Sequence, residues 1–287
     1  MLRLITFTVV GLLLLSYQTM AAEISPYGTF NYKWSHDENA SGVAYDKLEN
    51  NGSIIGVDII EDFDEASSMS GIAKIELGVD VDDSNSNTFD SRLAYVGVEN
   101  NGVAITVGRQ AHPFASVSKT GNFEVYGSNA VFKYGDRSSN TIKLDNGSFS
   151  AMAMIDGSTG QDGIDVWEAS LSHSIGDIDV SAGYSDDVVN DISYWGAGAS
   201  ASVGDITIAS TYTIKDAATD LVGMEATVGW KALTVGYGDK EGTGTYMTYG
   251  LSHSMTDSLT VYAEMQQDDL DTGTDLQHYS VGTKFTF

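Results

Sequence analysis

The side chains that could carry out chemistry are few and far apart in this sequence. Cysteine is absent, which excludes disulfides and thiolate metal sites. The acidic run that begins at Asp80 has the carboxylate spacing of a calcium loop, but Asn85 stands where that loop requires glycine, and the closing carboxylate is missing. Ser252 and His253 are adjacent in an alternating segment, so they point to opposite faces. We therefore expect no catalytic residues, no metal site and no cofactor.

Acidic residues dominate the charge of the chain. It has 40 Asp and Glu against 14 Lys and Arg, a net charge of -26, which would repel the phosphates of nucleic acids. Hydrophobic residues make up 42% of the chain, so it is not compositionally disordered. We expect a folded protein that does not bind nucleic acid.

The first 21 residues have the features of a secretory signal peptide. Arg3 is followed by an uncharged apolar stretch over residues 4–15, and small residues follow at Ala21 and Ala22. That stretch is shorter than the roughly 20 residues of a membrane-spanning helix. We expect cleavage after Ala21, which divides the chain into a signal peptide, residues 1–21, and a single exported domain, residues 22–287.

The exported part alternates with period two, which predicts strands. Near its end, Tyr279, Val281, Phe285 and Phe287 share one face and polar residues share the other. The sequence predicts sixteen strands, most of them about as long as a tilted strand needs to be to cross a bilayer. They cover approximately residues 24–34, 53–62, 69–80, 89–99, 102–109, 137–145, 148–157, 165–175, 178–186, 193–203, 206–215, 221–230, 233–239, 245–254, 259–267 and 277–287.

The connections between these strands also alternate. Tight turns such as Asn100-Asn101 and Gly204-Asp205 follow the even strands, and looser, more acidic links follow the odd ones. An even number of strands with short turns on one rim and longer loops on the other is typical of an antiparallel transmembrane β-barrel, with its apolar face toward lipid and its polar face toward water. The alternative is a secreted or outer-membrane β-protein that binds carbohydrate or acts as an adhesin.

One link is much longer than a hairpin loop. Residues 110–136 span 27 positions with patchy alternation, and a structureless link of this size usually has a function. Alternatively, the apolar residues between Glu124 and Tyr134 form a further pair of strands.

Several stretches, in the right order, resemble the Gram-negative general porins, and the resemblance covers the whole exported part. The stretches are residues 22–24 with 27–28, 91–97, 107–110 with 113–114, 137–142, 250–254 with 259–263, and the terminal Phe287. This resemblance implies a sixteen-stranded barrel in the outer membrane of a Gram-negative bacterium, assembled as a homotrimer. It also implies a passive diffusion channel for small hydrophilic solutes and ions, with the third loop folded inward.

In this family an acidic inward loop faces a ladder of basic side chains across the constriction. Arg92 matches one rung, and alternation places it toward the lumen together with Ala94 and Val96. Alternation also places Arg137 on the polar face with Thr141 and Lys143, so that Arg137 and Lys143 are further candidates for the basic side. On the loop, Glu124 and Asp136 are the acidic candidates, and Ile54 replaces another ladder arginine.

Other charged residues of the predicted strands fall on the polar face. The candidates for the lumen are Lys33, Lys74 and Lys284 among the bases and Asp58, Glu76, Glu168, Glu225 and Glu264 among the acids. Arg109 instead shares the outward face with Val103, Ile105 and Val107, and the resemblance suggests a contact near the trimer axis.

Three further expectations concern ion selectivity, lipid contacts and assembly. Arg3 is the only charged residue of the signal peptide, so residues 22–287 keep 13 basic and all 40 acidic side chains, which favours weak cation selectivity. The acidic outer loops suit lipopolysaccharide and outer-membrane lipid held through divalent cations. The last strand, with Tyr279, Val281, Phe285 and Phe287 on its lipid face, is the expected assembly signal.

Overall fold

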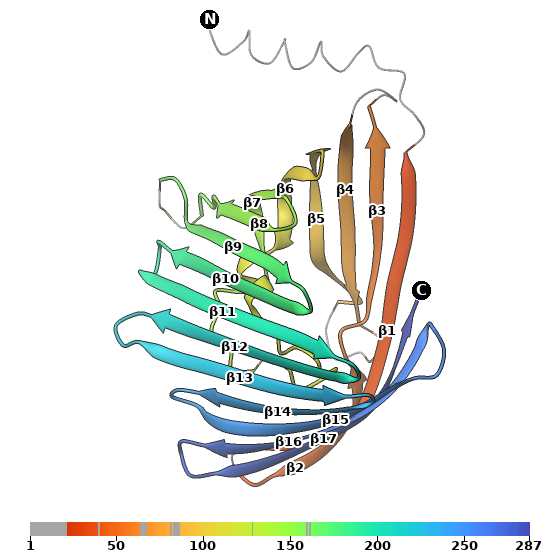
Figure 1. Ribbon diagram of the computed structural model, residues 1–287, viewed down its shortest axis with the longest axis vertical. Coiled ribbons are helices and arrows are strands. Elements are labelled where there is room, and N and C mark those ends of the chain that lie inside the picture. The colour runs from red at the N-terminus through yellow and green to blue at the C-terminus, as the bar shows by residue number, and fades with distance from the viewer. Residues whose placement is uncertain are drawn as a thin grey trace, which may run out of the picture.

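The strands of the chain close into one antiparallel β-barrel (Figure 1). The computed structural model describes residues 22–287 except 40, 64–67, 81, 83–86, 128, 159 and 161, so the predicted signal peptide lies outside the described residues. The strands are β1 (Glu23–Glu38), β2 (Ala44–Asn50), β3 (Ile54–Asp62), β4 (Met69–Val79), β5 (Phe89–Asn100), β6 (Val103–Ala111), β7 (Arg137–Asp145), β8 (Phe149–Met154), β9 (Val166–Ile175), β10 (Ile178–Asp187), β11 (Ile192–Val203), β12 (Ile206–Asp216), β13 (Leu221–Trp230), β14 (Leu233–Lys240), β15 (Gly244–Ser254), β16 (Leu259–Leu270) and β17 (Asp275–Thr286).

These seventeen segments make a sixteen-stranded barrel, because β2 and β3 lie end to end along β1 and together occupy the position of one strand. Tyr32 pairs with Asn50 of β2, whereas Thr29 pairs with Ile54 of β3. The first and last strands also pair, from Thr29 with Thr286 to Asp37 with His278, and this pairing closes the barrel. The predicted sixteen-stranded antiparallel barrel is confirmed.

The end of the first hairpin where β1 connects to β2 differs from the prediction. The first strand continues to Glu38, and β2 forms although residues 44–50 were predicted to lie in a loop. Its side chains are mostly exposed and polar, so no apolar alternation marks the segment. It pairs with β1 along its length, and Glu49 of β2 also contacts Lys33 of β1.

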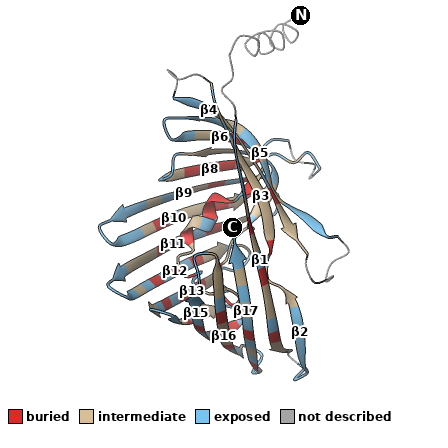
Figure 2. Cartoon of the chain, turned by 90° about the vertical axis from the view of Figure 1, so that its right-hand side faces the viewer, coloured by how far each residue is buried: buried red, intermediate tan, exposed pale blue. Residues whose placement is uncertain are grey.

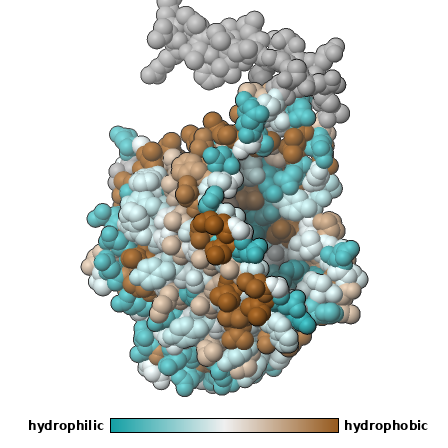
Figure 3. Space-filling view, in the orientation of Figure 1, coloured by the Kyte–Doolittle hydropathy of each residue, from teal (hydrophilic) through white to brown (hydrophobic). Residues whose placement is uncertain are grey.

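The outer face of the barrel is apolar and the inner face is polar. Exposed side chains include Trp34, Ile105, Trp195 and Val281, while polar side chains such as Asn31 and Thr213 are buried on the inner face (Figure 2). Figure 3 shows hydrophobic side chains gathered on the surface beside a hollow. In the described part of the chain, no helix is long and apolar enough to cross a membrane.

The long link between β6 and β7 folds into the barrel, where Figure 1 shows it behind β10 to β13. We call residues 112–136 the inward loop. It begins with a short 3-10 helix, Pro113–Val117, whose Phe114 and Val117 are buried. None of the described residues of the inward loop belongs to a strand, so the alternative of a further strand pair is wrong.

Candidate functional site

Glutamates of the inner wall hold the inward loop at several points. At its start, Glu168 of β9 accepts hydrogen bonds from the Nδ1 of His112 at 2.8 Å and from the backbone N–H of Phe114 at 3.1 Å. In the middle, the hydroxyl of Thr120 donates to Glu225 of β13 at 2.7 Å. The inward loop therefore lies along the wall on charge-assisted hydrogen bonds, which are stronger than neutral ones.

The third of these carboxylates makes the most backbone contacts. Glu264 of β16 accepts hydrogen bonds from the backbone N–H groups of Glu124, Val125 and Tyr126, the last two at 3.0 and 3.1 Å. Three consecutive donors that converge on one carboxylate fix the path of the chain at this point. An N–H group that lost this acceptor inside the barrel would need water or another partner.

Neutral side chains complete the attachment. The backbone N–H of Lys119 donates to the Thr211 hydroxyl at 2.9 Å, and that of Ala130 donates to the Tyr246 hydroxyl at 3.0 Å. Together with the glutamates, these contacts carry the loop across the wall from β9 to β16.

Glycines in the wall give the inward loop its space. A Cβ atom added at Gly198 would lie 2.0 Å from the carbonyl oxygen of Val117, and one at Gly223 would lie 1.9 Å from that of Ala130. Both distances are far below contact distance, so a side chain at either position would push the loop away from the wall. The sequence around these glycines places the loop against β11 and β13 and leaves the β3 to β7 side of the lumen uncovered.

The uncovered wall carries pairs of opposite charge. Arg92 Nε lies 2.7 Å from Glu76 Oε1, and Glu76 also accepts a hydrogen bond from the Tyr27 hydroxyl at 2.9 Å. Lys74 and Asp58 lie 3.1 Å apart. The sequence predicted these residues as lumen candidates, and the structure brings them together as ion pairs.

Three further lysine candidates of the wall also form ion pairs. Lys33 contacts Glu49 at 3.2 Å, and Lys143 contacts Asp145 at 3.2 Å. Lys143 pairs with Thr106 across the sheet, near the short-turn end of β7, so it lies toward that rim of the barrel. Lys284 forms an ion pair with Glu124 of the inward loop.

The prediction that Ala94 and Val96 share the lumenal face with Arg92 is wrong. Glu76 pairs with Leu93 and Leu77 pairs with Ser91, so Arg92 is the extra residue of a β-bulge. A bulge reverses the alternation beyond it. Arg92 still reaches the lumenal Glu76, but Val96 is 56% exposed on the outer face.

A second irregularity affects Arg137. The pairing of β6 with β7 shifts between Gly108 and Gln110, and Asn140 has a φ of 61°. Across this shift Ser138, rather than Ser139, continues the inner face of Thr141, and its hydroxyl lies 2.9 Å from His112 Nε2. The predicted shared face of Arg137, Thr141 and Lys143 is therefore wrong.

The acidic candidates of the loop lie next to bases. Glu124 contacts Lys284, and Asp136 contacts Lys133 within the loop. The hydrogen bond from Lys133 lowers the pKa of Asp136, and the charges of Lys133 and Arg137 act in the same direction. The two acidic candidates of the inward loop are thus each compensated by a neighbouring lysine.

Arg109 and the C-terminal residues lie on the outer face or at its edge. Arg109 pairs with Ala94 on that face and donates to the Ser91 carbonyl at 3.1 Å and to the Ser139 hydroxyl at 3.2 Å. Phe287 exchanges two backbone hydrogen bonds of 3.0 Å with Gly28, and its ring stacks on Phe30 with centroids 6.0 Å apart. Tyr279, Val281 and Phe285 of the last strand, β17, are exposed.

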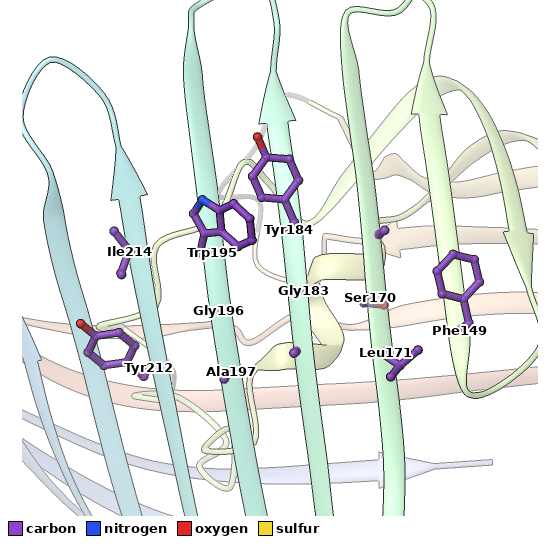
Figure 4. Close-up of a pocket in the computed structure, with 12 residues that line it drawn as sticks. Phe149, Ser170, Leu171, Gly183, Tyr184, Trp195, Gly196, Ala197, Tyr212 and Ile214 are labelled. Atoms are coloured by element: carbon purple, nitrogen blue, oxygen red, sulfur yellow. The ribbon is translucent and has the colours of Figure 1, made fainter.

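The concavity in Figure 4 lies on the outer face of β8 to β12 rather than in the lumen. Its floor contains Gly183, Gly196 and Ala197, and Tyr184 and Trp195 stand beside each other above it. Their ring centroids are 4.3 Å apart. Its lining is almost entirely apolar, which suits contact with lipid better than contact with a hydrophilic solute.

Sequence reasoning placed Glu168, Glu225 and Glu264 in the lumen but missed their role as anchors. Because an ionisable side chain on a buried strand face needs a partner, the position of these glutamates already indicated that another part of the chain would bind them. The calcium-like run falls largely outside the described residues, and among the described residues no group of three or more His, Cys, Asp or Glu side chains could hold a metal ion.

Comparisons with known proteins agree with this geometry. The Gram-negative porin family matches residues 10–284. Among curated proteins, no sequence matches the chain significantly. A loop L8 deletion mutant of OmpT, an outer membrane protein of Vibrio cholerae, is similar over 93% of this chain and 100% of its own, with a TM-score of 0.76 and 17% identity.

Two further solved structures share the fold. The trimer form of Vibrio cholerae OmpT covers 93% of this chain and 100% of its own, with a TM-score of 0.72 and 16% identity. OmpF of Salmonella typhi, in a complex with daunomycin, covers 94% of this chain and 100% of its own, with a TM-score of 0.73 and 13% identity.

Proposed function

The chain belongs to the Gram-negative porin family and is an outer-membrane channel, and from this premise we propose that small hydrophilic solutes and ions diffuse through it passively, with weak selectivity for cations. The observation that carries the proposal is the polar wall of the barrel interior that the inward loop leaves accessible. The inward loop lies against β9 to β16, and the polar wall of β3 to β7 faces the space that remains. Purified protein in a planar bilayer should give stepwise ohmic currents, and a protein that inserts without conducting would contradict the proposal.

The proposed selectivity rests on how the charges are distributed. The basic residues of the constriction have carboxylate neighbours, as in the pairs Arg92–Glu76 and Lys74–Asp58, so they create little net positive field. Residues 22–287 nevertheless have 40 acidic and 13 basic side chains. This excess concentrates cations at the mouths, although at physiological salt it is screened beyond roughly 8 Å. The resulting selectivity is weak and becomes stronger at low salt.

Replacement of Arg92 by alanine should strengthen cation selectivity. The change removes the cation that lies 2.7 Å from Glu76 and leaves that carboxylate without its ion-pair partner at the lumen wall. Fixed charge at a narrow point acts on ions at close range. The zero-current potential under a salt gradient should therefore move further toward the potential of a pure cation channel.

The double variant Arg92→Ala, Glu76→Gln is the matched control, because it removes both charges of the pair. Its zero-current potential should return to near that of the unmodified channel. A shift in the double variant as large as in Arg92→Ala would show that Glu76 is not the cause. Anion selectivity in the unmodified channel would overturn the proposed sign.

We also propose that the channel is a homotrimer and that Arg109 lies at a subunit contact. Support comes from the trimer form of the similar Vibrio cholerae protein and from the exposed position of a guanidinium on the outer face. A charge at that position is costly against lipid and acceptable at a protein contact. Arg109→Ala should lower the temperature at which the oligomer dissociates, measured on gels of samples heated to increasing temperatures. An unchanged dissociation temperature would show that Arg109 is not part of the contact. We further propose that lipopolysaccharide binds the channel through divalent cations, so chelation of these cations should release lipopolysaccharide from the purified oligomer.

A further inference from the structure

The lumenal side of β4 to β7 contains a niche that shares Lys74 with the charge pairs described above. It has a volume of about 330 Å³ and is lined by Lys74, Leu93, Tyr95, Glu99, Lys143 and Asp145, among others. Glu99 and Asp145 lie at the ends of β5 and β7, next to short turns, so the niche opens toward the periplasmic rim. Its size is at the lower end of the range for small-molecule sites.

The charges of the niche are balanced. Two lysines and two carboxylates line it, and each lysine lies beside a carboxylate: Lys143 is 3.2 Å from Asp145, and Lys74 is 3.1 Å from Asp58. The side chains of Lys74 and Lys143 are 21% and 19% exposed, and that of Asp145 is 38% exposed, so solutes in the lumen can reach them. Tyr95 lines the same niche and pairs with Lys74 across the sheet.

We propose that this niche binds small zwitterionic solutes of amino-acid size as they pass through the channel. The proposal rests on the channel function above and names a class of solute for it. A zwitterion replaces an ion pair without net change of charge, since its carboxylate can take the place of Asp145 at Lys143 and its ammonium can bind Asp145 or Glu99. The apolar side chain of the solute can then lie against Leu93 and the ring of Tyr95.

Other classes of solute fit less well. A simple anion would separate Lys143 from Asp145 and leave that carboxylate without its partner. A simple cation could bind Glu99 or Asp145 but would lose the contact that a carboxylate makes with Lys143. A neutral sugar would have to compete with an ion pair for each polar group. Charge-assisted hydrogen bonds to both ends of a zwitterion avoid both losses.

The experiment is current block in a planar bilayer with L-leucine as the probe. L-leucine carries no net charge, so it lowers the current, relative to the conductivity of the same solution, only when it occupies the lumen. We expect a saturable decrease in the unmodified channel. Lys143→Gln and Glu99→Gln should each raise the half-blocking concentration about tenfold, the value of one hydrogen bond to a charged group.

Lys231→Gln is the matched control, because Lys231 forms its ion pair with Asp205 near the turns, away from the niche. It should leave the half-blocking concentration unchanged. The proposal is overturned if L-leucine does not block an otherwise conducting channel, or if it blocks the Lys143 and Glu99 variants as strongly as the unmodified one. Loss of all current would instead refute the channel function, so the two failures are distinguishable.

Discussion

Deletion of Phe287 is expected to reduce the amount of folded barrel in the outer membrane by about tenfold or more. Phe287 exchanges two backbone hydrogen bonds with Gly28, and its ring stacks on Phe30 at the seam between the first and last strands. Gly28 provides the space, since a Cβ there would lie 2.6 Å from the Phe287 ring. Two hydrogen bonds and one aromatic contact together contribute about 2–3 kcal/mol, roughly a 30- to 150-fold change in an equilibrium constant. Because they form at the seam, their loss acts on the step in which the barrel closes.

The measurement is the fraction of protein that shows heat-modifiable migration in outer-membrane preparations. Phe287→Trp keeps an aromatic ring and the terminal carboxylate and should fold nearly normally. Val203→Ala removes apolar area from the outer face far from the seam, where Val203 is 74% exposed, and should also be tolerated. Normal amounts of folded protein after deletion of Phe287 would show that the seam forms without its last residue.

The strands were predictable because each has one apolar and one polar face. In β16, for example, Tyr262, Glu264 and Gln266 lie inside, as the alternation of the sequence predicts. The inward course of the 27-residue link was also confirmed, although the family resemblance, rather than any periodicity, implied it. A slip of one residue would turn the polar face toward lipid, so the alternation excludes it.

Other features could not be read from the pattern. The bulge at Arg92 precedes Leu93, Ala94, Tyr95 and Val96, which place apolar residues on both faces of the strand, so the sequence does not reveal the shift in alternation. The partners of Glu264 are backbone groups about 140 positions away, and backbone donors are the same in every sequence. Local pairing of Arg92 with Glu76 likewise depends on two strands meeting in a particular register.

Replacement of Glu264 by alanine is expected to destabilise the inward loop and to make the channel close frequently. The change leaves the N–H groups of Glu124, Val125 and Tyr126 without their common acceptor. A hydrogen bond to a charged group contributes about 1.5–3 kcal/mol, so the loss of one or two that water does not replace raises the detached population about 100-fold. A detached segment would move from the β16 wall into the open lumen.

Single-channel recordings measure this directly, as the frequency and duration of partial closures at a fixed voltage. Lys284→Met is the decisive comparison, because it removes only the ion pair between Lys284 and Glu124 and keeps the three backbone hydrogen bonds. Both side chains of that pair are partly exposed, and such pairs contribute at most about 1 kcal/mol, or roughly a fivefold change. Frequent closures in Glu264→Ala with quiet currents in Lys284→Met would identify the carboxylate of Glu264 as the anchor. Equally frequent closures in the two variants would mean that the ion pair of Glu124 with Lys284 holds the loop there instead.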